Sequence, residues 1–124
     1  MSTQDLVERY FDAINGHDWE QLAAVFHPEV TIQHGATLTT TGRDRAVKLL
    51  HAVVAQFAEH EGRVTRLLLD GPVAAVEIAF TGTLPNGKAV TFDAVDIIDT
   101  DGASITRVVS WYDTAEVLPQ LRVN

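Results

Sequence analysis

The sequence predicts one α+β domain, in which helices cover one face of a strongly curved, mostly antiparallel sheet. Apolar residues recur at helical spacing in three segments of the first 60 residues. Four runs rich in β-branched and aromatic residues fill most of the chain between residues 63 and 113. The sheet is expected to curve, because three helices must cover one face and leave a concave interior. Turn sequences separate the runs at residues 70–72, 85–87 and 101–102.

The first helix is predicted for residues 2–15. Ser2 and Asp5 have the spacing of a capping box, in which each side chain bonds the other residue's backbone. Gly16 follows the helix and is expected in the left-handed conformation that favours glycine. An apolar stripe at helical spacing is formed by Leu6, Val7, Tyr10, Phe11 and Ile14.

Two more helices are predicted before the strands. Asp18 can cap a short helix, which Pro28 ends. Residues 30–34 then alternate like a strand, which the glycine and threonines after it interrupt. Residues 41–44 have capping-box spacing again and open the longest predicted helix. We expect that helix to end near residues 60–62.

The second half is predicted to be mainly strands. These strands are expected at residues 63–70, 73–83, 89–99 and 104–113, with a short terminal helix at residues 114–121. The 124 residues are enough for one hydrophobic core and too few for two. No linker or repeat divides the chain, so residues 1–124 are expected to form a single domain.

The composition argues against several classes of partner. The formal net charge is −8 and the pI is about 4.9, so neither nucleic acid nor an anionic membrane surface is expected to bind. No run of 18 apolar residues and no secretory leader is visible, which makes the cytoplasm the expected location. The chain has no cysteine, and its histidines lack the spacing of zinc motifs. A metal site is therefore not expected.

The most informative stretch is residues 89–113, which is predicted to form a β-hairpin. Because side chains alternate between the two faces of a strand, Asp96 falls on an apolar face. Asp93 and Asp99 fall on the other face, where water or a dimer partner is expected to meet them. A carboxylate among apolar residues is costly unless it is paired, protonated or facing a cavity. The apolar residues that share its face are Phe92, Ala94 and Ile98.

Several segments resemble a known family. Residues 9–19 (RYFDAINGHDW), 26–32 (FHPEVTI) and 41–47 (TGRDRAV) resemble parts of the SnoaL-like and ketosteroid-isomerase-like proteins, within the nuclear transport factor 2-like superfamily. The hairpin that ends in residues 111–113 (WYD) resembles their last hairpin. The resemblance implies a cone, in which a bent sheet wraps around a long helix and an apolar pocket opens at one end. It also implies no cofactor, and dimers formed through the sheet.

The resemblance implies roles for individual residues. Tyr10 and Asp96 match the tyrosine and the protonated aspartate that form the oxyanion hole of ketosteroid isomerases. His34 stands where those enzymes carry a basic aspartate. The SnoaL-type cyclases differ, because they have a histidine at the position of Asp96 and an acid–base aspartate at that of Asp113. The chain matches each subfamily in part, and its candidate catalytic residues are Tyr10, His34, Asp96 and Asp113.

Each candidate also has a structural interpretation. Tyr10 can be a core residue of its helix, and His34 can bond the loop that follows its strand. Asp113 can cap the terminal helix that starts at Thr114, with Glu116 completing a capping box, and this is the favoured role for Asp113. The apolar residues expected to line the substrate pocket are Ile14, Trp19, Phe26, Ile32, Val53, Phe57, Phe80 and Trp111.

These observations predict a cofactor-independent isomerase or cyclase that acts on a small hydrophobic carbonyl compound of steroid or polyketide type. His34 would remove a proton, while Tyr10 and a neutral Asp96 would donate hydrogen bonds to the oxygen that gains charge. The main alternative is a module that binds a small molecule or forms a homodimer without catalysis. A lesser alternative is an epoxide hydrolase, in which Arg107 and two aspartates would activate water.

Overall fold

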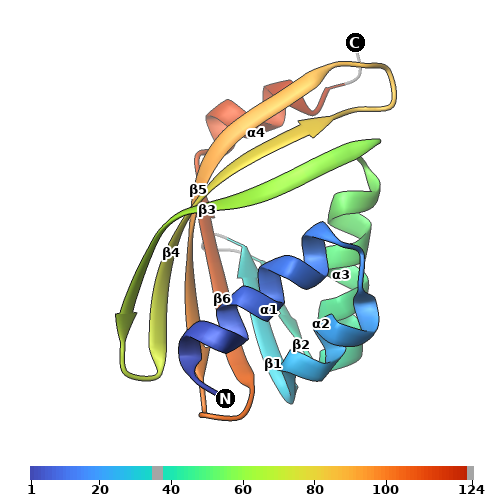
Figure 1. Ribbon diagram of the computed structural model, residues 1–124. Helices are drawn as coiled ribbons and strands as arrows, with labels where there is room; N and C mark the ends of the chain where they lie inside the picture. Colours follow the sequence, from blue (N-terminus) through green and yellow to red (C-terminus); the bar gives the residue numbers. More distant parts are fainter. Residues whose placement is uncertain (35–37, 123–124) are drawn as a thin grey trace.

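The structure, a computed structural model, describes residues 1–34 and 38–122. The strands of this part form one sheet in the order β2-β1-β6-β5-β4-β3 (Figure 1). Neighbouring strands are antiparallel except β1 and β6, which are parallel. The predicted α+β class is confirmed. The elements are α1 (Thr3–Asn15), α2 (Trp19–Val25), β1 (Phe26–His34), β2 (Leu38–Thr41), α3 (Arg43–Ala55), β3 (Glu59–Asp70), β4 (Val73–Thr83), β5 (Ala89–Thr100), β6 (Ile105–Tyr112) and α4 (Thr114–Gln120).

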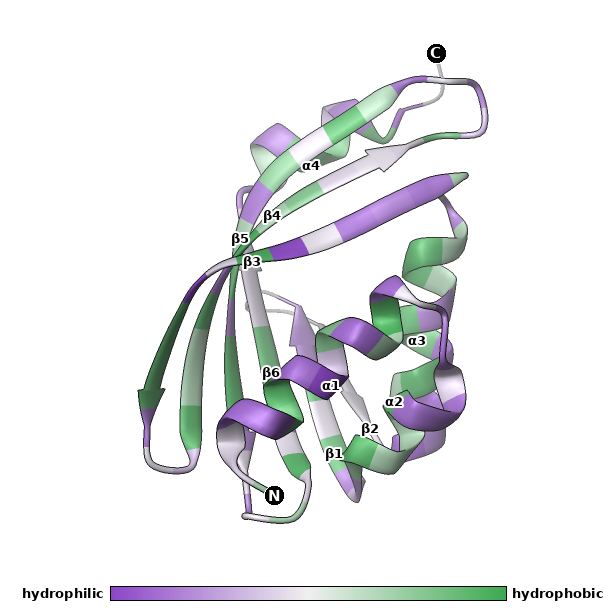
Figure 2. Cartoon of the chain, viewed as in Figure 1, coloured by the Kyte–Doolittle hydropathy of each residue, from purple (hydrophilic) through white to green (hydrophobic). Residues whose placement is uncertain are grey.

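The sheet is curved, and the first three helices gather on one side of it. Figure 1 shows β3, β4 and β5 changing direction midway along their length, with α1, α2 and α3 on the same side. Figure 2 shows hydrophilic and hydrophobic residues interspersed along α1, as expected for an amphipathic helix. Its buried side contributes Leu6 to a core cluster that also contains Phe26 of β1 and Ile98 of β5, and all three side chains are fully buried. Each such side chain stabilises the fold by about 1.5–3 kcal/mol.

The two ends of α1 are built differently from each other. Ser2 and Asp5 form the predicted capping box, with bonds of 3.0 and 3.2 Å between each side chain and the other's backbone N–H. Gly16 is not left-handed, since its φ is −92°, and the positive φ of 55° falls at His17 instead. A Cβ at Gly16 would lie 3.0 Å from the Asp12 carbonyl oxygen. The glycine therefore avoids a tight contact at this position and does not form a left-handed turn.

The start of α3 also differs from the prediction. Gly42 occupies the position before the helix, and no side chain caps the first turn. Thr41 cannot serve as the predicted cap because it is the last residue of β2, where it pairs with Thr31 of β1. Residues 35–37, where the first strand was expected to be interrupted, lie outside the described residues.

The end of α3 comes earlier than predicted. The helix ends at Ala55, because Glu59 already begins β3 and pairs with Thr83 of β4. His60, predicted on the helix, therefore lies in the sheet. At these lengths, none of the helices in the described part of the chain is long and apolar enough to cross a bilayer.

The β5–β6 hairpin has the predicted turn and the predicted faces. Glycine adopts a positive φ at each of the three predicted turns, at Gly71, Gly87 and Gly102. Along β5, Asp96 stands opposite Val76 of β4 on one side and Ser110 of β6 on the other. This register puts the carboxyl group on the side of the sheet that the helices cover.

Candidate active site

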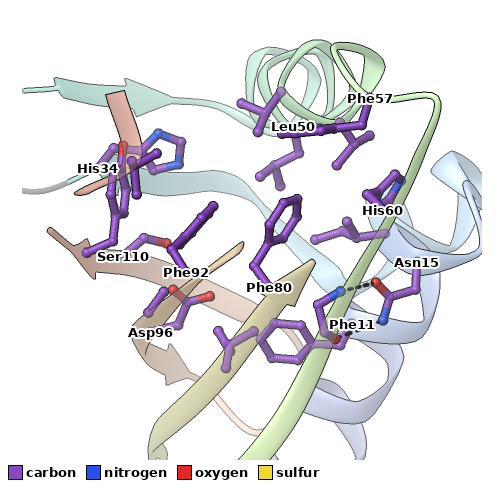
Figure 3. Close-up of a pocket in the computed structure, with 18 of the residues that line it drawn as sticks. Phe11, Asn15, His34, Leu50, Phe57, His60, Phe80, Phe92, Asp96 and Ser110 are labelled. Carbon is purple, nitrogen blue, oxygen red and sulfur yellow. Dashed lines mark hydrogen bonds between the residues drawn. The ribbon is translucent and has the colours of Figure 1, made fainter. Parts of the chain in front are cut away.

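A cavity of about 250 Å³ lies between the sheet and the helices. Side chains from α1, α3, α4 and the strands β1, β3, β4, β5 and β6 line it. Figure 3 shows Phe80 and Phe92 in its middle, between Asp96 and Leu50 of α3. Most of the lining is apolar, which suits a small hydrophobic ligand. A chain of aromatic contacts runs through Phe57, Phe80, Phe92 and Tyr112, with successive ring-centroid distances of 5.1, 4.8 and 5.9 Å.

Asp96 supplies the one carboxyl group of the described cavity lining. The residue is 5% exposed, and none of the ion pairs among the described residues includes it. The hydroxyl of Ser110 donates a hydrogen bond to its carboxylate instead. Burial raises the pKa of Asp96 to about 6, and the bond from Ser110 opposes that rise. Asp96 can therefore gain or lose a proton close to neutral pH.

Tyr10 faces the same cavity from α1. Its ring packs edge-on against Phe11 and lies beside Phe26, with centroid distances of 5.0 and 5.9 Å, so it also belongs to the core. The pKa of Tyr10 is raised well above its usual value, chiefly by burial and secondly by the nearby charge of Asp96. Tyr10 therefore stays protonated at neutral pH and can donate a hydrogen bond.

His34 lines the cavity from the end of β1. Its ring meets Tyr112 edge-on, with a centroid distance of 6.5 Å. Burial lowers the pKa of His34 below its usual value, so the ring is largely neutral at pH 7 and can accept a proton. The structure thus brings His34, Tyr10 and Asp96 to one cavity from three different elements.

Asp113 is not brought to the cavity. It is exposed, and its carboxylate caps α4 by accepting a 2.9 Å hydrogen bond from the backbone N–H of Ala115. The residues that line the cavity do not include it. The structural role that the sequence favoured for Asp113 accounts for its position, whereas the catalytic role does not.

Four of the eight apolar residues expected in the pocket line it, and four lie elsewhere. Phe26 and Ile32 are buried in the core, because the residues of β1 before His34 lie under the helices. Trp19 stacks between His17 and His51, with centroid distances of 5.9 and 4.6 Å, and does not reach the cavity. The four residues that line the cavity are Ile14, Val53, Phe57 and Phe80.

Trp111 and Arg107 point to the outer face of the sheet. Ser110 and Tyr112 take the inner positions of β6, so alternation sends Trp111 outward, where it is 48% exposed. Arg107 also points outward and pairs with Asp99 at 3.7 Å. The lining described for the cavity contains no arginine, so the Asp–Arg–Asp set of the epoxide hydrolase alternative is not assembled there.

The sequence analysis missed polar residues on two sides of the cavity. Ser110 could have been found from the hairpin register, because it stands directly opposite Asp96. Asn15 and His60 line the far side. The Asn15 side chain bonds both backbone groups of Gly62, at 2.9 and 3.0 Å, and so ties α1 to β3 (Figure 3). His60 is not predicted to line the cavity, because the sequence predicts a helix up to residues 60–62, where the structure has the start of β3.

His60 also contacts a second histidine. The Nε2 atoms of His60 and His17 are 2.6 Å apart, and the two rings stack. Burial, and then the nearby His17, lower the pKa of His60, so the two rings share a hydrogen bond with His60 neutral. Within residues 1–34 and 38–122, no three histidine, aspartate or glutamate side chains are placed to hold one metal ion.

The curved sheet and the helices on one side of it enclose an apolar cavity with one carboxylic acid in its described lining. The family model of the SnoaL-like domain matches residues 7–108. The chain therefore belongs to the SnoaL-like family, and its fold is that of the nuclear transport factor 2-like proteins. A comparison with curated protein sequences gave no significant match.

Solved structures share this fold over almost the whole chain. A nuclear transport factor 2-like protein of unknown function from Burkholderia pseudomallei has a TM-score of 0.88 and 21% identity, over 99% of this chain and 100% of that one. A candidate polyketide cyclase from Xanthomonas campestris pv. campestris has a TM-score of 0.87 and 21% identity, over 97% and 96% of the chains. A candidate ketosteroid isomerase from Kribbella flavida has a TM-score of 0.76 and 28% identity, over 90% and 77%.

Proposed function

We propose that the protein is a cofactor-independent isomerase or cyclase, which uses general acid–base catalysis on a small hydrophobic carbonyl compound. One observation carries this proposal: Asp96 is buried in an apolar cavity, and the described residues offer it no cationic partner. Keeping such a carboxyl group in the folded state is costly. Costs of this kind are typical of active sites, where shifted pKa values cluster.

The proposed reaction moves a proton next to a carbonyl group. His34 takes the proton from the neighbouring carbon, and the electrons of the broken C–H bond move to the carbonyl oxygen. Tyr10 and protonated Asp96 donate hydrogen bonds to that oxygen as it becomes an enolate. Return of the proton from His34 to a different carbon completes an isomerisation. Attack of the enolate carbon on a second carbonyl completes a cyclisation, and the proton then goes to the new alkoxide.

The protonation states set the expected pH dependence. Activity needs Asp96 protonated, so it should fall as pH rises above the Asp96 pKa of about 6. Activity also needs His34 neutral, so it should fall again below the lowered pKa of His34. We therefore expect a bell-shaped profile with its optimum on the acidic side of neutrality.

A fluorescence titration with 2-naphthol tests the proposal, because the ionised phenol resembles an enolate held by oxyanion donors. The variants are Tyr10→Phe and Asp96→Asn, and Asp99→Asn is the matched control on the outer face of the same strand. We expect preferential binding of the ionised phenol, at least tenfold weaker in the two cavity variants and unchanged in the control. Naphthol affinity that is the same in the wild type and in both cavity variants would refute an oxyanion site.

A non-catalytic binding module is the second candidate. The stacked rings of Phe80 and Phe92, with centroids 4.8 Å apart, could hold a flat ligand without any chemistry. In that case naphthol affinity should fall in Phe80→Leu and Phe92→Leu but not in Tyr10→Phe or Asp96→Asn. The same titration series therefore separates the two functions.

We also propose that the protein forms a homodimer through the outer face of the sheet. Trp111 and Leu68 are 48% and 51% exposed, and strand alternation puts both on that face together with Ile97. Exposed apolar groups on one face are typical of interaction surfaces. Sedimentation should show a dimer in the wild type and a monomer in Trp111→Lys. A wild-type monomer at micromolar concentration would contradict the proposal.

A further inference from the structure

Three polar side chains of the cavity stand in one row across the sheet. Asp96 of β5 pairs with Ser110 of β6 in the antiparallel register, and Ser110 pairs with His34 of β1 in the parallel register. All three residues line the cavity. Figure 3 shows Ser110 beside Asp96, with His34 farther along the same side. Since neighbouring strands are about 4.8 Å apart, Ser110 is the one residue of this row between the acid and the base.

The hydroxyl group of Ser110 is suited to link two groups that exchange a proton. It donates a hydrogen bond to the Asp96 carboxylate. A hydroxyl donates one hydrogen bond and accepts two, so the bond can reverse when Asp96 becomes protonated. The Ser110 oxygen can at the same time accept a hydrogen bond from the direction of His34.

The two ends of the row differ in their access to water. Asp96 is 5% exposed, whereas His34 is only partly buried. A proton from solvent therefore meets His34 more readily than it meets Asp96. The proposed reaction nevertheless needs the proton on Asp96 and a neutral His34 before a substrate can react.

We propose that Ser110 couples the protonation of Asp96 to that of His34, so that a proton taken up at His34 is delivered to Asp96. One cavity water completes the link between the Ser110 hydroxyl and the His34 ring. This inference rests on the proposed acid–base function, because it explains how the buried donor is loaded. Ser110 acts through its neighbours and is a positioning residue.

The transfer is balanced at every step. The imidazolium N–H of His34 gives its proton to the water, and the water gives one of its own to Ser110. Ser110 passes its hydroxyl proton to the Asp96 carboxylate. The chain starts with Asp96 ionised and His34 protonated, and it ends with Asp96 protonated and His34 neutral. The water and Ser110 are unchanged.

The proton affinities of the two end groups support the coupling. Burial raises the pKa of Asp96 to about 6 and lowers that of His34 from its usual 6.5, so both shifts favour the state in which Asp96 holds the proton and His34 is neutral. The other titratable groups that line the cavity are Tyr10 of α1, Tyr112 of β6 and His60 of β3. Helices α3 and α4 contribute only apolar side chains to the described lining.

A double-mutant cycle on the pKa of Asp96 tests the coupling, with the carboxyl ¹³C followed by NMR in the ligand-free protein. In the wild-type background, His34→Gln should raise the pKa of Asp96 by about half a unit or more, because the positive charge that His34 gains as the pH falls no longer favours the Asp96 carboxylate. In Ser110→Ala, the same His34→Gln change should have less than half that effect. An equal effect in both backgrounds would overturn the inference, since it would show coupling through space alone.

Three further variants control the cycle. Ser110→Thr keeps the hydroxyl group and should keep the coupling. Ser110→Cys has a similar size but a weak donor, so it should lose the coupling and replaces the alanine variant if that protein is unstable. Ser104→Ala is the matched control, because the Ser104 hydroxyl lies 3.2 Å from an Asp101 carboxylate oxygen in the same hairpin but outside the cavity. It should leave the cycle unchanged.

The naphthol titration separates failure of the coupling from failure of the proposed function. If ionised naphthol binding depends on Tyr10 and Asp96 while Ser110→Ala leaves the cycle unchanged, the oxyanion site stands and the coupling is refuted. If the cycle shows the coupling while substitutions of Tyr10 and Asp96 leave the affinity for naphthol unchanged, the proton link is established in a site that does not bind oxyanions.

Discussion

Two aspartates of β5 lie in opposite environments, one on each face of the strand. Asp96 points into the cavity, is 5% exposed, and has a pKa raised to about 6. Asp99 lies on the other face of the same strand, keeps contact with water and pairs with Arg107 at 3.7 Å. Residue type and strand are identical, and only the parity of the position differs. In this fold, parity along a strand decides whether an aspartate is a candidate for chemistry or part of a surface ion pair.

Solvation explains the difference. An exposed ion pair contributes about 0–1 kcal/mol to stability. Burial of an unpaired carboxylate works against folding, and raising the pKa of Asp96 from 3.8 to about 6 corresponds to roughly 3 kcal/mol at pH 7. The inner face therefore keeps an acid that weakens the fold, which is the reason to look for a function there.

Activity should separate the two faces most strongly. With a substrate in hand, Asp96→Leu is expected to lower kcat by about 10²–10³, because one oxyanion donor is lost. Asp99→Leu should leave kcat within about twofold, since its side chain never reaches the cavity. Steady-state kinetics near pH 6 provides the measurement, with circular dichroism to show that both variants fold. Equal losses in the two variants would remove the functional distinction between the faces.

Stability should respond to pH through Asp96. Its folded pKa lies above the unfolded value, so the folded state holds the proton more tightly and the contribution of Asp96 to stability is lost as pH rises from about 4 to about 6. At pH 7, Asp96→Asn should therefore be more stable than the wild type, by up to roughly 3 kcal/mol. Urea unfolding at pH 7 and pH 4 checks this, and the difference should shrink at pH 4.

Comparing the wild type with Asp96→Asn separates the effect of Asp96 on stability from the effects of the other carboxyl groups. Backbone hydrogen bonds are the main cause that lowers the pKa values of Asp5 and Asp101, so those residues act in the opposite direction as pH falls. They do so equally in wild type and Asp96→Asn. A stability difference that stays constant between pH 4 and pH 7 would mean that Asp96 has an ordinary pKa.

Asp113 tests a third environment, the cap of a helix. Asp113→Ala should lower the free energy of unfolding by about 1 kcal/mol, because the bond to the Ala115 N–H is lost. Asp113→Ser keeps a capping side chain and should recover most of that loss. Naphthol titrations of both variants should retain the preference for the ionised phenol. Loss of that preference would restore Asp113 as a candidate catalytic residue.

The smallest effect is expected at the outer ion pair. Asp99→Asn should change the free energy of unfolding by no more than about 0.5 kcal/mol, because both side chains of the pair are partly exposed. Urea unfolding at low and high salt is the measurement. A loss well above 1 kcal/mol would show that the pair is desolvated, as it would be if a second subunit covered the outer face.

Local features of the fold could be predicted from the sequence. The Ser2–Asp5 capping box and the turn at Gly102 depend on residues that are close in the chain, and both are present. The end of α3 could not be placed, because Glu59 enters the sheet by pairing with Thr83 on a later strand. Helical periodicity contains no information about that distant partner.

The candidate site was only partly predictable for a related reason. Alternation within β5 was enough to place Asp96 on the inner face. On β6 the same rule required the register against β5, since a slip of one residue would exchange Ser110 and Trp111 between the faces. The register puts Ser110 opposite Asp96, so Trp111 lies outside the pocket to which the sequence assigned it.

The parallel pairing of β1 with β6 has a consequence for how the site is made during synthesis. His34 comes into line with Ser110 and Asp96 only after β6, near the end of the chain, has paired with β1. Contacts between such distant segments form slowly, because a long loop must close first. A nascent chain that stops at residue 104 already contains Tyr10, His34 and Asp96, but it lacks the strand that joins the last two. Such a chain has the three residues that the proposal assigns to catalysis, but not the arrangement that brings His34 and Asp96 into one row.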